Sequence, residues 1–136
     1  MIVVDASVLT HALTDDGRYG DLARHELSAD SHWVGPEHLR VETFSSIRRL
    51  DQHRKIQPER ARSALTALSQ LAIEISSTAT LLKRMWELRH NLSGYDAAYV
   101  ATAEANQCAL VTADMRLARA TGLRCEIRTL GRREST

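Results

Sequence analysis

The sequence predicts an α/β protein, organised as a three-layer α/β/α sandwich around a parallel sheet. Short apolar segments alternate along the chain with longer segments of helical periodicity, which is typical of repeated β–α–β units. Residues 2–4 and 109–112 are predominantly apolar, which favours central strands covered on both faces. Residues 72–75 and 125–128 alternate between apolar and polar side chains, so we expect these strands nearer the edges of the sheet.

Local signals define each element. The expected strands cover residues 2–4, 32–34, 72–75, 109–112 and 125–128. The expected helices cover residues 8–13, 19–27, 36–54, 58–71, 79–90, 95–106 and 114–121. Pro36 and Pro58 suit the first turn of a helix, where a missing N–H costs no hydrogen bond. Gly122 can end the helix before it, and the alanine-rich segment 95–106 can lie close against a sheet.

Length and composition limit the possible functions. The 136 residues suffice for one domain, which we expect over residues 1–130, with a polar tail at residues 131–136. Lys and Arg total 18 and Asp and Glu total 17, so the net charge of +1 argues against a protein that binds nucleic acid by bulk charge alone. Only six residues are aromatic, which is few for a protein that stacks single-stranded bases on a row of rings.

The N-terminus and the cysteines indicate a cellular compartment. The first residues lack the basic and apolar segments of a signal peptide, and no window of about 18 apolar residues could span a membrane. Two cysteines, Cys108 and Cys125, are too few for a disulfide framework or a four-cysteine zinc site, so we expect buried free thiols. These patterns predict a soluble cytoplasmic protein that does not bind membranes.

Four acidic residues occupy positions from which they can reach one crevice. Asp5 follows the first expected strand and Asp114 follows the strand at residues 109–112, at the carboxyl edge where open α/β sheets bind ligands. Asp96 begins the helix that leads to that second strand, and Glu42 lies about two turns into its expected helix. Unpaired carboxylates at close range repel each other. The pattern therefore favours a hard divalent cation such as Mg²⁺ or Mn²⁺ between them.

Each of these acids also has a purely structural interpretation. Asp5 could cap the helix that follows it, with Ser7 as the alternative cap. Asp96 and Asp114 lie in first helical turns, where a negative charge suits the helix dipole. Glu42 could be a solvated helix residue. A shared site is favoured because two predicted strands end in aspartate at the same sheet edge.

Four segments together resemble the PIN domain and, within it, the VapC-type toxins of bacterial toxin–antitoxin pairs. They are Val4-Asp5-Ala6-Ser7, Glu42 in the third helix, Gly94-Tyr95-Asp96-Ala97-Ala98-Tyr99-Val100-Ala101-Thr102-Ala103 and Leu110-Val111-Thr112-Ala113-Asp114-Met115-Arg116-Leu117-Ala118. The resemblance covers residue 2 to about residue 128. It implies a five-stranded parallel sheet of order 3-2-1-4-5. It also implies an acidic quartet at Asp5, Glu42, Asp96 and Asp114, supported by the hydroxyls of Ser7 and Thr112.

The resemblance implies an activity as well, namely Mg²⁺-dependent endonucleolytic cleavage of RNA, with Mn²⁺ as a possible substitute. The cation would polarise the scissile phosphate and lower the pKa of a bound water. Asp5, Asp96 and Asp114 are the first choices for metal binding, directly or through water, and Glu42 could complete the site or orient the water. The family further implies a VapB-type antitoxin, bound in part by the helices after the second strand, and a homodimer.

Several basic residues carry weaker signals. Arg116 lies two residues after Asp114 and could contact a phosphate, or it could be an ordinary surface arginine. Five basic residues on or beside the helix of Glu42 could guide RNA to the crevice, or they could form a solvated face. These five are Arg40, Arg48, Arg49, Arg54 and Lys55. The six histidines are scattered and show no zinc-ligand spacing.

Three other functions remain open at this point. A non-catalytic RNA- or protein-binding module could use the same fold. A receiver-type signalling domain would need a phospho-accepting aspartate after the middle strand and a lysine after the last, but Asp51 falls within a helix and no lysine follows residue 83. A magnesium-dependent phosphatase with an Asp-x-Asp motif would need a second aspartate where Ser7 stands.

Overall fold

A five-stranded parallel sheet forms the middle layer of the molecule. The computed structural model describes residues 1–131, and the residues of the expected polar tail beyond Gly131 lie outside this range. The strands are β1 (Ile2–Val4), β2 (Trp33–Pro36), β3 (Ile73–Ser76), β4 (Ala109–Thr112) and β5 (Ile127–Thr129). Their order across the sheet is β3-β2-β1-β4-β5, and all neighbouring pairs run parallel. The expected fold class and strand order are confirmed.

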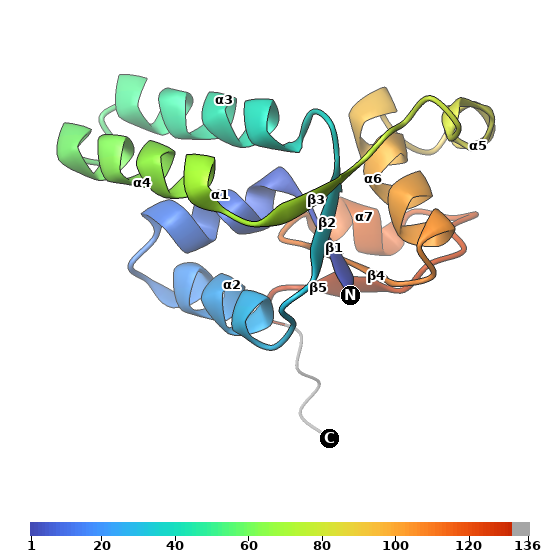
Figure 1. Cartoon of the computed structure of the whole chain (residues 1–136), viewed down its shortest axis with the longest axis horizontal. Helices are drawn as coiled ribbons and strands as arrows, with labels where there is room; N and C mark the ends of the chain where they lie inside the picture. The colour runs from blue at the N-terminus through green and yellow to red at the C-terminus, as the bar shows by residue number, and fades with distance from the viewer. Residues whose placement is uncertain (132–136) are drawn as a thin grey trace.

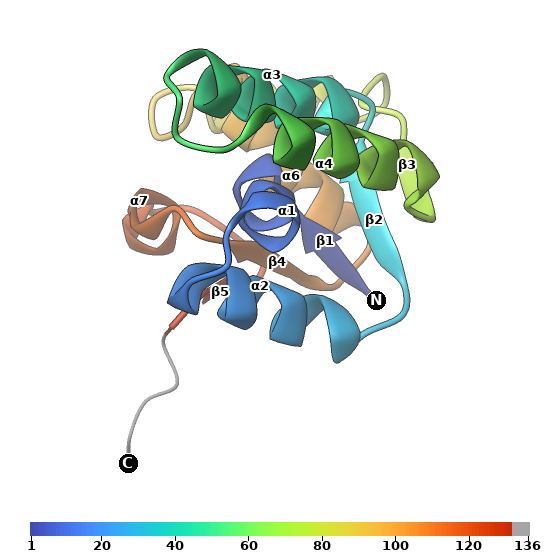
Figure 2. The same ribbon diagram turned by 90° about the vertical axis from the view of Figure 1, so that its left-hand side faces the viewer.

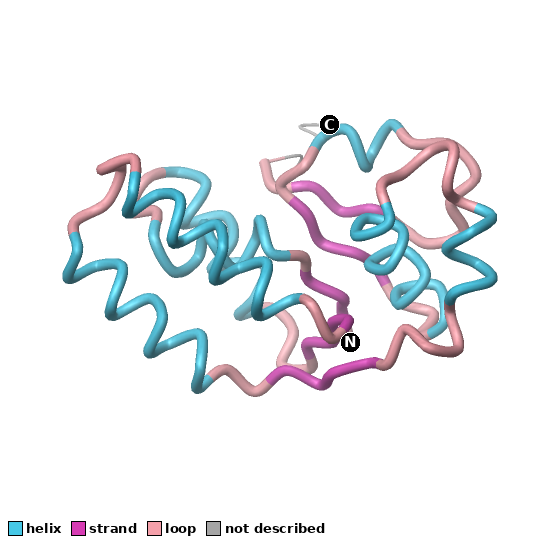
Figure 3. The backbone as a smooth tube through the Cα atoms, turned by 90° about the horizontal axis from the view of Figure 1, so that it is seen from above, coloured by secondary structure: helices cyan, strands magenta, loops and turns pink. Residues whose placement is uncertain are grey.

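Helices cover both faces of this sheet (Figures 1 and 2). They are α1 (Ala6–Thr14), α2 (Arg18–Ser28), α3 (Leu39–Gln52), α4 (Pro58–Gln70), α5 (Leu82–Glu87), α6 (Gly94–Ala105) and α7 (Met115–Arg119). Helix α1 packs on α2, α3 and α4, whereas α5 packs on α6, and α6 lies on the central strands. Figure 3 shows the strands between these two groups of helices. No helix of the described residues is both long enough and apolar enough to cross a membrane.

The topology fixes where a ligand site can form. The chain moves outward from β1 to β2 and β3, and then returns across β1 to add β4 and β5 on the other side. Right-handed crossovers place the helices of the two halves on opposite faces. The direction of winding therefore reverses between β1 and β4, and the carboxyl ends of these two strands border the crevice of an open α/β sheet.

The core agrees with the patterning of the sequence. Val3, Val4 and Leu110 of the two central strands are fully buried. The small side chains of α6, including Ala97 and Ala103, are buried as well, as expected for an alanine-rich helix that lies close to the sheet. Burial of this apolar surface, at about 25 cal/mol per Å², is the main favourable term that holds the three layers together.

The connection from β2 to α3 differs from the expectation. β2 continues through Pro36, and α3 begins at Leu39 rather than at the proline. Pro36 pairs with Ser76 of β3, but the pairing of β2 with β1 ends at Val34. Since the proline lies beyond the ladder with β1, its missing N–H leaves no gap on that side. Glu42 consequently lies in the first turn of α3, not two turns into the helix.

Two helices are shorter than expected, and the last strand is displaced. The segment after β3 forms a turn before α5 begins at Leu82, because Glu37 accepts hydrogen bonds from the N–H and the hydroxyl of Thr78. Helix α7 ends at Arg119, ahead of Gly122 with its φ of +82°. β5 spans residues 127–129 instead of 125–128. The two cysteines are free thiols but only partly buried, so the expectation of full burial was wrong.

Candidate active site

Each of the four acids stands at the N-terminus of a helix. Asp5 and Asp114 are the N-cap residues of α1 and α7, whereas Glu42 and Asp96 lie in the first turns of α3 and α6. The positive end of a helix dipole stabilises a nearby anion by about 0.3–1 kcal/mol. The structural interpretation of Asp5 and Asp114 as caps is therefore correct, but it does not exclude a common site. α1 follows β1, α3 follows β2, α6 precedes β4 and α7 follows β4.

Asp5 is the most deeply buried of these acids, with 5% of its surface exposed. Its Oδ1 accepts hydrogen bonds from the N–H groups of Ser7 (3.1 Å) and Val8 (3.3 Å). The hydroxyls of Ser7 and Thr112 donate to Oδ1 and Oδ2 respectively. Burial raises the pKa of the Asp5 carboxyl above its ordinary value, although these hydrogen bonds oppose the shift. Four hydrogen bonds thus hold the Asp5 carboxyl group in position.

The hydroxyls of Ser7 and Thr112 link Asp5 to the loop after β4. The Thr112 Oγ1 accepts a hydrogen bond from the N–H of Asp114 (3.0 Å), and the Ser7 Oγ accepts one from the N–H of Ala113 (2.9 Å). Each hydroxyl thus donates to Asp5 and accepts from the loop that carries Asp114. The two hydroxyls hold the ends of β1 and β4 at a fixed separation. Ser7 and Thr112 thus contact Asp5 at the positions where the resemblance to the PIN domain implies supporting hydroxyls.

Glu42 and Asp96 line a cavity of about 420 Å³ beside Asp5, together with Ser93, Tyr95 and Arg116 among others. Burial raises the pKa of Glu42 to about 7, and the negative charges of Asp5 and Asp96 add to the shift. Burial also raises the pKa of Asp96, with a further contribution from the charge of Asp114. These couplings mean that the carboxylates lie close enough to repel one another. The structure thus brings the four predicted acids together.

Asp114 differs from the other acids because it already has a cationic partner. The Arg116 guanidinium donates to both carboxylate oxygens, at 3.2 Å (Nε to Oδ1) and 2.9 Å (Nη2 to Oδ2). These hydrogen bonds hold the pKa of Asp114 below its ordinary value. The side chain of Arg116 is 84% exposed, so solvent weakens the pair and the guanidinium can exchange partners.

His38 is a residue of this site that the sequence analysis missed. Its Nε2 lies 3.4 Å from Oε2 of Glu42, and its ring packs against Tyr99 with 4.9 Å between the ring centroids. Burial lowers the pKa of His38, which favours the neutral ring beside Glu42. A neutral imidazole does not compensate the charge of the carboxylate. The signal in the sequence was the spacing of four residues between His38 and Glu42, which places both side chains on one face of a helix.

The donor chemistry of the cluster fits a hard divalent cation. In the described residues, no three Asp, Glu, His or Cys side chains are placed to hold one metal ion directly. Mg²⁺, however, keeps several waters and is usually held by only one or two carboxylates together with substrate phosphate. Asp5, Glu42 and Asp96 offer oxygen ligands only, and their mutual repulsion would be relieved by a cation. These acids, together with Asp114 beside Asp96, therefore fit a cation held partly through water.

The five basic residues near Glu42 do not form one uniform surface. The Arg40 guanidinium donates to the carbonyl oxygens of Leu68 (2.6 Å) and Leu71 (2.8 Å), at the C-terminal end of α4. Arg40 is therefore committed to the packing of α3 on α4. Arg49 and Lys55 instead line a separate pocket between α1 and α3. The five residues therefore do not form the single basic face that the sequence suggested.

Comparison with known proteins gives this site a family. The model of the PIN domain matches residues 2–123 of the chain. The chain belongs to the PIN-domain family. Ribonuclease VapC9 of Mycobacterium tuberculosis is 42% identical over 132 residues, which cover 97% of this chain and 100% of VapC9. Ribonuclease VapC1 of the same species is 39% identical over 127 residues, or 93% of this chain and 95% of VapC1. This PIN domain is thus similar over nearly its whole length to ribonucleases of the VapC type.

Solved structures agree with the PIN fold. VapC20 of Mycobacterium tuberculosis, a toxin that cleaves the sarcin–ricin loop, aligns with a TM-score of 0.62 over 81% of this chain and 87% of VapC20, at 19% identity. A chain of VapBC2 from Rickettsia felis, bound to a DNA fragment from its promoter, aligns with a TM-score of 0.68 over 96% of this chain and 99% of that chain, at 17% identity. At these identities the likeness concerns the fold.

Proposed function

We propose that this PIN domain is the toxin of a type II toxin–antitoxin pair and cleaves RNA by metal-dependent hydrolysis. The observation that carries the proposal is the convergence of Asp5, Glu42 and Asp96, since burial raises the pKa of each and the charge of at least one neighbouring acid adds to the shift. Such a cluster is costly unless a cation binds there. The VapC ribonucleases VapC9 and VapC1 are its relatives over nearly the whole chain.

The residues of the chain have distinct tasks in this mechanism. Asp5, Asp96 and Asp114 would hold Mg²⁺, with Mn²⁺ as a possible substitute, and Glu42 would complete the site or orient the attacking water. When bound, the metal ion supplies Lewis-acid activation of the phosphate and of water. Ser7 and Thr112 hold Asp5 as an oriented hydrogen-bond acceptor. In-line attack would expel the 3′-oxygen and leave a 5′-phosphate on the downstream fragment.

Arg116 would stabilise the substrate. Its guanidinium pairs with Asp114 and is largely exposed, so it can exchange the carboxylate for a phosphate of the RNA. A cation bound by Asp114 would favour this exchange, since the carboxylate would then have another partner. The phosphate contact proposed for Arg116 therefore depends on metal binding at the neighbouring acid.

The proposed setting is the cytoplasm, with a VapB-type antitoxin as the protein partner. VapBC2 of Rickettsia felis is such a toxin–antitoxin complex. We propose that residues 1–130 form a single nuclease domain and that this domain is a homodimer. Several large apolar side chains are exposed, including Phe44 (45%), Trp86 (67%) and Tyr95 (68%). Exposed apolar groups of this size are typical of protein–protein interfaces.

Substitution of single acids tests the proposed chemistry. We expect Asp5→Asn and Asp96→Asn each to reduce RNA cleavage by about 100-fold or more, because each removes a charged oxygen ligand but keeps the volume of the side chain. Asp51→Asn removes the same charge from an exposed position of α3 and should cleave normally. Cleavage is measured by mapping new RNA 5′ ends, with and without EDTA, and folding by circular dichroism.

Two results would contradict the proposal. Full activity of a folded Asp5→Asn or Asp96→Asn protein that still requires metal would exclude the acids as the reactive centre. Growth arrest by the wild-type protein without new RNA 5′ ends would indicate a different toxic activity, such as that of a non-catalytic binding module.

A further inference from the structure

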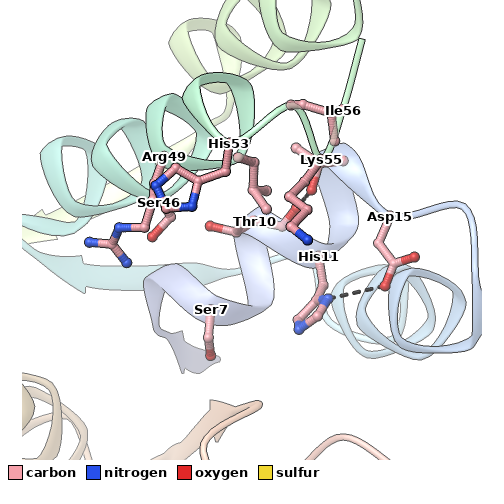
Figure 4. A pocket seen from close by; sticks show the side chains of 11 residues that line it. Ser7, Thr10, His11, Asp15, Ser46, Arg49, His53, Lys55 and Ile56 are labelled. Atoms are coloured by element: carbon pink, nitrogen blue, oxygen red, sulfur yellow. Dashed lines mark hydrogen bonds and ion pairs between the residues drawn. The ribbon is translucent and has the colours of Figure 1, made fainter.

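A second pocket, of about 550 Å³, lies between α1 and α3. Figure 4 shows side chains of the two helices facing one another across it. Its lining consists of Ser7, Thr10, His11, Thr14, Asp15, Ser46, Arg49, Leu50, His53, Lys55 and Ile56. The volume lies within the roughly 300–1,000 Å³ of typical ligand sites. Neither the four acids nor His38 belongs to this lining.

The pocket adjoins the candidate active site at Ser7. Ser7 lines the pocket and donates a hydrogen bond to Asp5. The same two helices carry acids of the site at their N-termini, since Asp5 caps α1 and Glu42 lies in the first turn of α3. The pocket thus begins at the Asp5 end of α1 and extends to the C-terminal half of α3, so an RNA backbone that leaves the acidic cluster along α1 would enter it.

The charge of the pocket is opposite to that of the acidic cluster. Arg49, His53 and Lys55 lie on its α3 side. Within residues 1–131, neither Arg49 nor Lys55 forms a side-chain ion pair. Asp15 is the one acid of the lining, and its Oδ1 accepts a hydrogen bond from the N–H of Gly17 (2.7 Å). Its Oδ2 lies 3.2 Å from Nδ1 of His11, as Figure 4 shows. The pocket thus offers cations that the protein does not itself neutralise.

We propose that this pocket binds the phosphodiester backbone of the RNA beside the scissile phosphate, with Arg49 and Lys55 as the phosphate ligands. The proposal rests on the proposed ribonuclease function and assigns a substrate subsite to it. Phosphates that approach four carboxylates are repelled by them, and nearby cations offset that repulsion. The guanidinium of Arg49 can form two parallel hydrogen bonds to one phosphate, whereas the ammonium of Lys55 acts as a point charge.

The structure separates these two residues from their basic neighbours. Arg40 is bound to carbonyl oxygens of α4 and is not free to bind RNA. Arg48 is exposed next to Arg49 but does not line the pocket. Arg48 therefore serves as a matched control, because its substitution removes the same charge one residue away on the same helix.

RNA binding in the absence of metal tests the proposal. The probe is a fluorescein-labelled single-stranded RNA of random sequence, followed by anisotropy in EDTA so that no cleavage occurs. We expect Arg49→Ala and Lys55→Ala each to weaken binding by roughly fivefold to tenfold, and Arg48→Ala to change it by less than about twofold. The double variant should also reduce the slope of log K against log salt by about 0.7 for each lost phosphate contact. In metal-dependent cleavage, KM should rise while kcat stays near the wild-type value.

Several outcomes would overturn the subsite. Equal effects of Arg49→Ala and Arg48→Ala would show that only general charge matters. An unchanged affinity for RNA combined with weaker binding of the antitoxin would assign the pocket to the protein partner. Since binding is measured without metal, its result does not depend on cleavage: loss of cleavage in Asp96→Asn with normal RNA binding by Arg49→Ala would refute the subsite but not the ribonuclease function.

Discussion

Glu42 combines a carboxylate with a setting that disfavours its ionised form. Its side chain is 37% exposed, yet burial and two neighbouring acids raise its pKa from 4.5 to about 7. Between pH 4.5 and about pH 7, the Glu42 carboxyl therefore keeps its proton in the folded protein but loses it in the unfolded chain. Stability that is present at low pH is lost as pH rises through this window, because ionisation costs more in the folded state.

The substitution Glu42→Gln should remove this loss of stability at high pH, because glutamine does not ionise. We expect the variant and the wild type to be equally stable below about pH 4.5, and the variant to be more stable by on the order of 1 kcal/mol above pH 7. This figure is well below the full shift because solvent screens a partly exposed group. Urea unfolding in EDTA at a series of pH values measures the difference.

An acid in the first turn of another helix provides the control for this prediction. Glu59→Gln in α4 removes the same charge from an exposed position away from the cluster. It should give no gain that grows with pH. If the stability difference between Glu42→Gln and the wild type does not change between pH 4 and about pH 8, the repulsion assigned to this carboxylate is refuted.

At the scale of elements, Arg40 ties α3 to the end of α4. The last carbonyl groups of a helix lack partners within the helix, and the guanidinium supplies two donors to Leu68 and Leu71. Arg40→Ala should reduce the free energy of unfolding by about 1–3 kcal/mol, because partly buried carbonyl groups lose charged donors. Arg48→Ala should change it by less than about 0.5 kcal/mol. Thermal and urea unfolding of both variants measure the two values.

RNA binding by the same variant distinguishes a structural arginine from one that binds RNA. Arg40→Ala should retain normal RNA binding at temperatures where it remains folded. Weaker RNA binding by this variant with unchanged stability would contradict the role assigned to Arg40.

Most elements were predictable because their signals are local. The apolar strands at residues 2–4 and 109–112 and the alanine-rich helix that became α6 depend on composition and period alone. The extension of β2 through Pro36 depends on where its partner β1 ends, and the turn before α5 depends on Glu37 of another segment. Those contacts arise only in the folded chain, so propensity could not reveal them.

The candidate site also has features that the sequence predicts and features that arise only in the folded chain. The positions of Asp5 and Asp114 after central strands were predictable from the pattern of the sheet, and so was the neighbourhood of Asp96. The contact of His38 with Glu42 could have been predicted from their spacing of four residues, but the packing of His38 against Tyr99 arises only in the folded chain. The pairing of Arg116 with Asp114 and the commitment of Arg40 to α4 depend on side-chain directions that a sequence does not contain.

Across the whole molecule, charge is distributed unevenly. Apart from the four acids of the site, the chain has 18 basic and 13 acidic residues. The near-zero net charge thus combines a concentrated acidic crevice with a mildly basic body. Such a distribution suits a protein that binds RNA through phosphates and a metal ion, and the small number of aromatic residues agrees with this mode.

Metal should therefore stabilise the folded protein as a whole, since the unfolded chain has no such cluster. Mg²⁺ at about 100 times its dissociation constant should add about 2.7 kcal/mol, which raises Tm by several degrees for a domain of this size. Differential scanning calorimetry with Mg²⁺, Mn²⁺ and Na⁺ at equal ionic strength measures the shift. Asp96→Asn should lose most of it. An equal shift with Na⁺, or an undiminished shift in Asp96→Asn, would exclude binding at the acids.

The hydrogen bond from Thr112 to Asp5 joins residues that are 107 positions apart in the chain. The acidic crevice exists only when β4 has docked against β1, and β4 ends at Thr112 of a 136-residue chain. During translation, a nascent chain that lacks β4 cannot assemble the reactive centre. The acidic crevice therefore forms only after the residues of β4 have been synthesised and have docked beside β1, so no shorter N-terminal segment of the chain can hold the complete cluster.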